Sequence, residues 1–99
     1  MSEPAAPAGA PLTRIIEIVN KKGLHARASA KFVQCVERFD AEVKVTRGNE
    51  TVGGTSIMGL MMLAAAPGTS ITVMTTGKQA GEAMDAIAAL VTGGFGEED

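Results

Sequence analysis

The chain has 99 residues and a formal net charge of −2 at pH 7, which fits a single domain. Its slightly acidic balance argues against a nucleic-acid-binding protein, because phosphate contacts need a basic surface. Hydrophobic residues make up 45% of the chain, but Phe occurs only three times and Trp and Tyr are absent. We therefore expect a largely aliphatic core.

The single cysteine and the single histidine restrict the chemistry further. Cys35 cannot form an internal disulfide, which favours a reducing, cytoplasmic setting, and it falls inside a helical pattern where we expect a buried thiol. One histidine and one cysteine cannot build a nitrogen–sulfur zinc site, so we expect neither a metal nor another cofactor. We also expect no membrane partner, because every apolar run is far shorter than the ~20 residues of a membrane helix.

In chain order, the first segment is an Ala/Pro-rich stretch, residues 1–11, which lacks a signal-peptide pattern and is predicted to be a disordered tail. Residues 12–19 are rich in β-branched side chains and predict a strand. After a polar turn, a helix is predicted from His25 or Ala26 to about Arg38, because apolar residues recur at i, i+4 and i+7. That apolar stripe consists of Phe32, Val36 and Phe39.

A hairpin and a short helix follow. Residues 41–47 alternate apolar and polar side chains, which is typical of a half-buried antiparallel strand. The Gly48–Asn49 turn leads into a weak return strand over residues 50–53. Ser56 is the predicted N-cap of a helix over residues 57–65, which an Ala-Pro-Gly stretch ends.

The C-terminal part is predicted to contain a strand over residues 70–76, a helix over residues 79–91 and an acidic tail over residues 95–99, in which residues 97–99 are expected to be solvated. The element order β-α-β-β-α-β-α predicts an α+β domain over residues 12–94, with two layers and the helices on one face of a four-stranded sheet. The buried stripe of the last helix is expected to be Ala80, Met84, Ile87 and Val91.

His25 is the strongest candidate for chemistry, within Gly-Leu-His-Ala-Arg at residues 23–27. It follows a glycine turn and opens a helix, where backbone N–H groups are unpaired and the helix dipole is positive. A neutral imidazole is nucleophilic, and a phosphoryl group on its nitrogen could be neutralised by the helix N–H groups and by Arg27. The same residues also fit an ordinary helix cap with an exposed histidine.

Other catalytic arrangements are not supported. Residues 48–55 fall short of a phosphate-binding loop, because Gly54 stands where the lysine is required. The chain has no nucleophile elbow, and its carboxylates do not pair as acid and base. A hydrolase that uses His25 is therefore a weaker hypothesis than a phosphoryl carrier.

Ser56 is a second phosphoryl candidate, and phosphorylation there would add ~1.5 to 2 negative charges at a helix start. A plain helix cap explains the same serine. The segment after it is too apolar for a helix with one buried face. Leu60 and Leu63 can fill the core, while Met58 and Met61 form either an exposed docking patch or a methionine-rich core.

The segment at residues 23–27 and Ser-Ile-Met-Gly-Leu-Met-Met-Leu at residues 56–63 resemble HPr, the histidine phosphocarrier family of the bacterial phosphotransferase system. The resemblance extends over residues 12–91. It implies an open-faced β-sandwich, in which three helices cover one face of an antiparallel sheet of order 1-4-2-3.

The resemblance also implies the function. Enzyme I, charged from phosphoenolpyruvate, would phosphorylate His25 at Nδ1, and the group would pass to a protein of the enzyme IIA type. The protein would be a cytoplasmic, monomeric carrier without enzymatic turnover, in which Arg27 steadies the phosphoryl group. Ser56 would be modified by an ATP-dependent HPr kinase/phosphorylase. The implied partner-docking residues are Ala26, Ala30, Ile57, Met58 and Met61.

The sequence departs from the family pattern in two ways. Ala28 stands where most members have proline, and its backbone N–H could add a phosphate contact. Gln34 and Glu37 occupy positions that sugar-system members often fill with basic residues, which indicates the regulatory or nitrogen branch of the system. A regulatory α/β binding domain without covalent phosphoryl chemistry is the alternative function.

Overall fold

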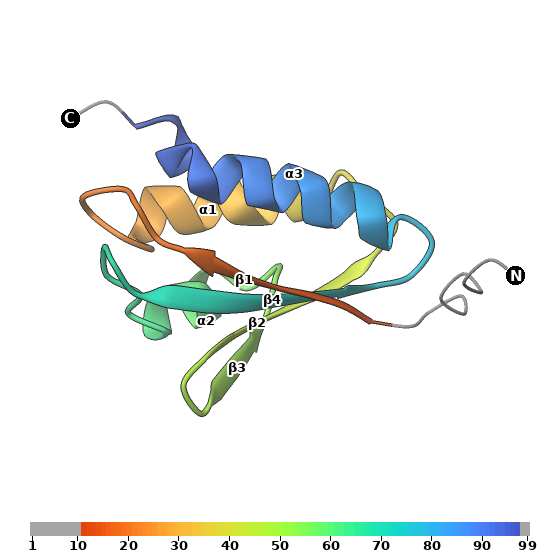
Figure 1. Ribbon diagram of the computed structural model, residues 1–99, viewed down its shortest axis with the longest axis horizontal. Helices are drawn as coiled ribbons and strands as arrows, with labels where there is room; N and C mark the ends of the chain where they lie inside the picture. Colours follow the sequence, from red (N-terminus) through yellow and green to blue (C-terminus); the bar gives the residue numbers. More distant parts are fainter. Residues whose placement is uncertain (1–10, 98–99) are drawn as a thin grey trace, which may run out of the picture.

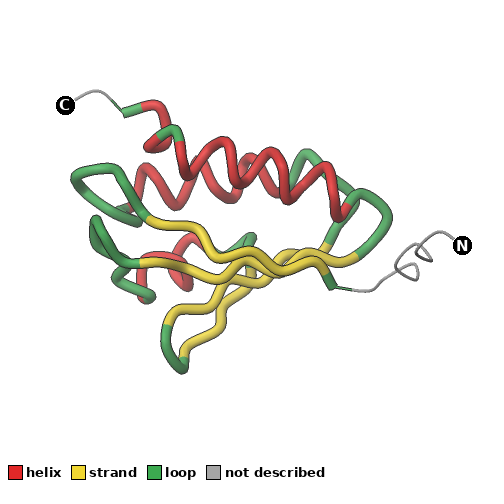
Figure 2. The backbone as a smooth tube through the Cα atoms, in the orientation of Figure 1, coloured by secondary structure: helices red, strands yellow, loops and turns green. Residues whose placement is uncertain are grey.

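The computed structural model describes residues 11–97, which form two layers (Figures 1 and 2). One layer is an antiparallel sheet, and the other contains two long helices, α1 and α3, that lie along one face of the sheet. The strands are β1 (Leu12–Glu17), β2 (Glu42–Arg47), β3 (Glu50–Gly53) and β4 (Ser70–Thr76). The helices are α1 (Ala26–Val36), α2 (Ile57–Met62), α3 (Ala80–Thr92) and the short 3-10 helix η1 (Gly94–Gly96).

The sheet has the strand order β1-β4-β2-β3, and all of its neighbouring strands are antiparallel. The central strand β4 pairs with β1 through Ile71 opposite Ile16, and with β2 through Val73 opposite Val45. All four of these side chains are buried between the sheet and the helices. The predicted fold and its strand order are confirmed.

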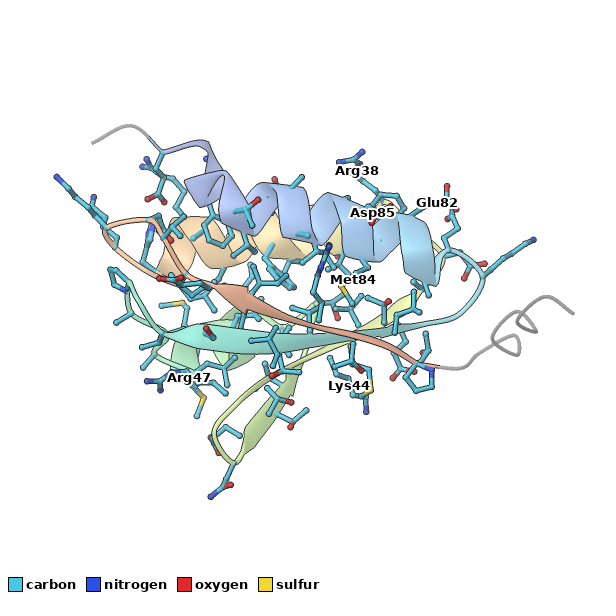
Figure 3. The ribbon with its side chains drawn as sticks, viewed as in Figure 1. Arg38, Lys44, Arg47, Glu82, Met84 and Asp85 are labelled. Atoms are coloured by element: carbon cyan, nitrogen blue, oxygen red, sulfur yellow. The ribbon has the colours of Figure 1, made fainter. Side chains whose placement is uncertain are left out.

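The core follows the apolar periodicity of the sequence. Phe32 on α1 is fully buried, which contributes ~1.5–3 kcal/mol relative to an exposed side chain. Met84 points from α3 toward the sheet, whereas Glu82 points away from it (Figure 3), and Asp85 is exposed like Glu82. Lys44 is exposed on the open face of the sheet, as its alternation with buried valines predicts.

Some element boundaries differ from the predictions. β1 ends before Ile18, although the Ile18 backbone still accepts a hydrogen bond from Gly68 and donates one to Thr69, both of 2.8 Å. α2 ends at Met62 rather than near residue 65. The cause is Ala64, whose positive φ of 52° is incompatible with a continuing helix.

The chain turns back onto the domain after α3. Phe95 is 1% exposed, and its carbonyl oxygen accepts a 2.7 Å hydrogen bond from Lys31 Nζ. The aromatic ring of Phe95 therefore completes the core, and Glu97 is half-buried rather than solvated as predicted. The remainder of that predicted tail and residues 1–10 of the predicted N-terminal tail lie outside the described residues. No helix within residues 11–97 combines the length and apolar character needed to cross a membrane.

Candidate functional site

A tight turn at Gly23 sets the position of His25. Gly23 has a φ of +62°, and a Cβ atom at this position would collide with the carbonyl oxygen of Ala65. Only glycine satisfies both the backbone conformation and the close approach. The next residue, Leu24, is buried and donates its N–H to that same carbonyl over 3.0 Å. The chain therefore enters His25 along a fixed path.

His25 occupies the N-cap position of α1 in an extended conformation, with φ −78° and ψ −178°. Its carbonyl accepts the first hydrogen bond of the helix, from Ser29 over 2.9 Å. Its ring makes no capping hydrogen bond, and 27% of the side chain is exposed. The imidazole is thus not an ordinary cap, and part of it remains open to a partner.

The start of α1 presents positive potential beside this ring. The N–H groups of Ala26, Arg27 and Ala28 precede the first backbone hydrogen bond of the helix, so they are the donors that a helix start leaves for an anion. The first turn of α1 contains no acidic residue that would neutralise them. The Arg27 side chain is exposed two residues after His25. The arrangement can accommodate an anionic group on the imidazole.

Glu97 is the unexpected member of the site. Its Oε2 lies 2.5 Å from His25 Nε2, and its Oε1 accepts a 3.1 Å hydrogen bond from Asn20 Nδ2. The hydrogen bonds from His25 and Asn20 lower the pKa of the Glu97 carboxyl group. The Glu97 side chain is 14% exposed and lies against the His25 ring.

The sequence contained one signal that could have indicated this contact. Phe95 lies between glycines directly after the last helical stripe, and a lone aromatic residue in such a position favours a segment that folds back onto the core. The acidic character of the residues after it obscured that signal. No periodic pattern in the sequence indicates which carboxylate contacts His25.

Ser56 is the N-cap of α2, as predicted. Its Oγ accepts a 2.9 Å hydrogen bond from the Gly59 backbone, and its side chain is exposed. Gly59, within α2, also has a structural role. A Cβ at Gly59 would come within 2.9 Å of Ser56 Oγ and 3.0 Å of Val52 Cβ, so the glycine lets the cap and β3 approach the helix closely.

An apolar surface, here called the α2 patch, consists of Ile57, Met58, Met61 and Met62 on α2, a helix that contacts α1. Met58 and Met61 are exposed, so the prediction of surface methionines is correct and the alternative of a methionine-rich core is wrong. Ala26 is exposed and Ala30 is half-buried on α1. In chain order, the four residues of the α2 patch are 41%, 70%, 39% and 70% exposed.

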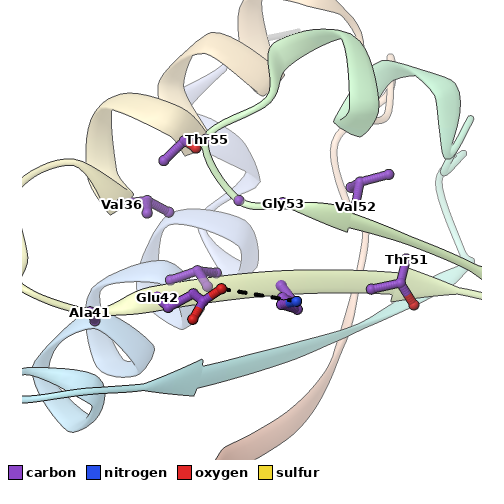
Figure 4. Close-up of a pocket in the computed structure, with 10 residues that line it drawn as sticks. Val36, Ala41, Glu42, Thr51, Val52, Gly53 and Thr55 are labelled. Carbon is purple, nitrogen blue, oxygen red and sulfur yellow. Dashed lines mark ion pairs between the residues drawn. The ribbon is translucent and has the colours of Figure 1, made fainter.

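Two other features lie outside the candidate site. Cys35 is buried, and burial raises the pKa of its thiol, which opposes nucleophilic chemistry. A pocket of about 410 Å³ lies beside β2 and β3 and contains the Glu42–Lys44 ion pair, 3.9 Å long (Figure 4). Neither His25 nor Arg27 lines this pocket. Within residues 11–97 no three His, Cys, Asp or Glu side chains are grouped as metal ligands.

The chain has an antiparallel sheet of order β1-β4-β2-β3 beneath two long helices, and a part-exposed histidine lies at the start of the first helix. These features define a small α+β protein of the HPr fold. Residues 12–93 match the family described as "PTS HPr component phosphorylation site". The chain belongs to this HPr family, whose members are phosphocarriers of the phosphotransferase system.

Its relatives include phosphocarrier protein HPr of Neisseria meningitidis serogroup A, with 56% identity over 87% of this chain and 97% of the relative. Phosphocarrier protein HPr of Cupriavidus necator is 50% identical over the same shares of the two chains. Phosphocarrier protein NPr of Shewanella violacea is 42% identical over 87% of this chain and 94% of its own.

Solved structures agree with this assignment. HPr-C-His from Thermoanaerobacter tengcongensis superposes with a TM-score of 0.84 and 39% identity, covering 89% of this chain and 99% of that one. HPr from Bacillus anthracis gives a TM-score of 0.79 and 41% identity, covering 83% and 98%. Each match covers nearly the whole length of the relative, so the similarity concerns the complete HPr fold.

Proposed function

We propose that this protein carries a phosphoryl group on His25 between two proteins. Enzyme I, charged from phosphoenolpyruvate, is the donor, and a protein of the enzyme IIA type is the acceptor. The observation that carries the proposal is the part-exposed His25 ring at the positive end of α1, beside Arg27. The protein acts stoichiometrically, as a cytoplasmic monomer, and turns over no substrate alone.

The transfer is a displacement at phosphorus. The Nδ1 lone pair of His25 attacks the phosphorus of phosphorylated enzyme I, and a new N–P bond forms. The donor's own bond to phosphorus breaks, and its electron pair returns to the donor atom. The acceptor then attacks in the same way, and the electron pair of the His25 N–P bond returns to Nδ1. Such transfers depend on positioning and on charge stabilisation, which a small protein can share with its partner.

Charge stabilisation comes from the start of α1 and from Arg27. A phosphoryl group on Nδ1 carries more than one negative charge, and the free N–H groups of residues 26–28 are suitable donors to its oxygens. The Arg27 guanidinium adds a charge-assisted hydrogen bond. Ala28 keeps an N–H that a proline would lack, which adds one donor at this position.

Partner docking uses the α2 patch together with Ala26 and Ala30. Methionine side chains are flexible and polarizable, so one such patch can fit both a donor and an acceptor. The small alanine side chains allow a partner to approach His25 closely. The patch members named in the sequence prediction are Ile57, Met58 and Met61, and Met62 extends it.

Ser56 provides regulation of this docking. An HPr kinase/phosphorylase would use ATP to phosphorylate its exposed hydroxyl, directly before Ile57 of the α2 patch. The added ~1.5 to 2 negative charges would oppose the docking of an acidic partner surface.

The surface of α1 favours the regulatory branch of the phosphotransferase system. Gln34 and Glu37 are both exposed, and they occupy the two positions that sugar-system members often fill with basic groups to meet acidic partner faces. An acceptor without a strongly acidic face would dock here without like-charge repulsion.

The proposal is tested by incubating the full chain with enzyme I and labelled phosphoenolpyruvate. We expect an acid-labile, base-stable label, and we expect its loss in His25→Ala. A Gln79→Ala variant, altered outside the candidate site, is the control and keeps the label. The absence of label at saturating enzyme I would instead support a binding domain without covalent chemistry. Turnover of a small phosphoester without partners would support a hydrolase.

A further inference from the structure

The contact between His25 and Glu97 determines which ring nitrogen is free. Two oxygens of an ionised carboxylate can only accept hydrogen bonds, so the 2.5 Å contact with Oε2 requires a proton on Nε2. A neutral imidazole carries one ring proton, and its other nitrogen therefore holds the lone pair. Glu97 thus leaves the nucleophilic lone pair on Nδ1.

We infer that Glu97 is a positioning residue for phosphoryl transfer, which holds the His25 proton on Nε2 and directs the reaction to Nδ1. The catalytic consequence rests on the proposed phosphocarrier function, whereas the choice of tautomer does not. The logic is that of a catalytic triad, in which a carboxylate fixes the tautomer of the histidine and stabilises its imidazolium form.

The carboxylate is held in place by a buried side chain. Asn20 is 5% exposed, and its Nδ2 donates to Glu97 Oε1 over 3.1 Å and to the Gly23 carbonyl over 2.9 Å. One amide thus joins the carboxylate to the turn that positions His25. Asn20 Oδ1 is buried without a partner among residues 11–97, a cost that the fold tolerates here.

The backbone that delivers Glu97 is also fixed. Phe95 is buried with a φ of +59°, an unusual conformation for a bulky residue that its packing stabilises. Lys31 Nζ donates to the Phe95 carbonyl over 2.7 Å and ties this segment to α1. Glu97 therefore approaches His25 from a packed segment.

The same carboxylate acts during the transfer. When the Nδ1 lone pair forms the N–P bond, the bond between phosphorus and the donor atom breaks and the proton stays on Nε2. The His25 ring then bears a positive charge, which the Glu97 carboxylate stabilises. Within residues 11–97, Arg27 and Lys31 are two charged side chains in the first half of α1, and both are positive. Glu97 is thus a negative group that favours the positively charged phosphorylated ring.

The test uses Glu97→Gln and Glu97→Ala in the full chain, with Glu50→Gln as a charge-matched control on the β2–β3 hairpin (Figure 1). Ring ¹⁵N NMR of the unphosphorylated protein reports the tautomer. We expect the proton on Nε2 in the parent, in the control and in Glu97→Gln, whose amide oxygen can still accept. In Glu97→Ala we expect a detectable Nδ1–H fraction.

The phosphorylated protein gives a second measurement. After labelling by enzyme I, spontaneous loss of label from His25 at neutral pH should be slower in both Glu97 variants than in the control, because the phosphorylated ring loses the carboxylate that stabilises its positively charged, labile form. Tautomers and label lifetimes in both Glu97 variants that match the control, with His25 labelled, would overturn the positioning role. A parent protein that enzyme I cannot label would overturn the proposed function, while the tautomer measurement would still decide the role of Glu97.

Discussion

Asn20 and Glu97 are 77 positions apart in the chain, and the hydrogen bond of 3.1 Å between them joins the loop after β1 to the segment after η1. The same Asn20 amide donates to the Gly23 carbonyl over 2.9 Å. Because His25 follows that turn, one buried side chain connects the candidate nucleophile to the carboxylate beside it. The site therefore depends on a residue that takes no direct part in the chemistry.

The first prediction concerns Asn20→Ala, which removes both donated hydrogen bonds. We expect the free energy of unfolding to fall by about 1–3 kcal/mol. The pKa of Glu97 should rise toward its usual range, because one of the hydrogen bonds that lower it is lost. Urea unfolding and ¹³C NMR titration of the carboxyl carbon measure the two effects. Gln34→Ala, which truncates an exposed amide, is the control, and an equally small effect in both variants would contradict the prediction.

The second prediction concerns pH. The folded-state pKa of Glu97 lies below its usual value, so its stabilising contribution is present above the usual glutamate range and is lost as the pH falls through the lowered value. His25 and Asn20 donate its hydrogen bonds, and Lys31 is a positive group that acts on it. The difference in unfolding free energy between the parent and Glu97→Gln should therefore shrink on acidification. Urea unfolding at a series of pH values measures it, and a difference that stays constant would refute the assignment.

The third prediction concerns Gly23→Ala. The new Cβ would meet the Ala65 carbonyl oxygen at a positive φ, so we expect a destabilisation of about 1–3 kcal/mol or more. The rate of phosphorylation by enzyme I should also fall, because the turn positions His25. Gly48→Ala is a matched control, since it has a similar φ of +61° but open space around it. Equal losses of stability in the two variants would show that the collision is unimportant.

The local features of this fold could be predicted from the sequence, because they depend on neighbours along the chain. The spacing of Phe32 and Val36 identified the buried face of α1, and Ser56 was recognisable as a cap from its place before an apolar run. His25 stood out through its glycine turn and the helix that follows. These assignments needed no knowledge of how distant segments pack.

The contact of Glu97 could not be predicted in this way. It joins residues 72 positions apart, and it depends on Phe95 entering the core with a left-handed backbone. Neither the charge nor the hydrophobic periodicity of the sequence indicates that the chain turns back onto the domain after α3, since an acidic C-terminal stretch is usually solvated. Similarly, the early end of α2 depends on the left-handed backbone of Ala64, although alanine favours helix by propensity.

The fourth prediction concerns Ala28→Pro. Position 28 precedes the first hydrogen bond of α1, so proline should be tolerated by the helix. It removes one backbone donor near the proposed phosphoryl group, and we expect a shorter phosphohistidine lifetime, by roughly threefold for one modest hydrogen bond. The lifetime is measured by loss of label from purified phosphoprotein at neutral pH. Ala41→Pro, placed before β2, controls for a general effect of proline, and an unchanged lifetime in Ala28→Pro would count against the extra contact.

The fifth prediction concerns Ser56→Asp. Aspartate is also a good N-cap, so α2 should remain folded while its exposed end gains negative charge next to the α2 patch. We expect phosphorylation of His25 by enzyme I to slow by roughly tenfold at low salt, because the charge weakens the encounter with an acidic partner surface. The effect should diminish as salt screens the charges. Asn49→Asp on the β2–β3 turn adds the same charge elsewhere. Rates for Ser56→Asp that equal those of the parent and of this control, at low and moderate salt, would remove the electrostatic account of Ser56.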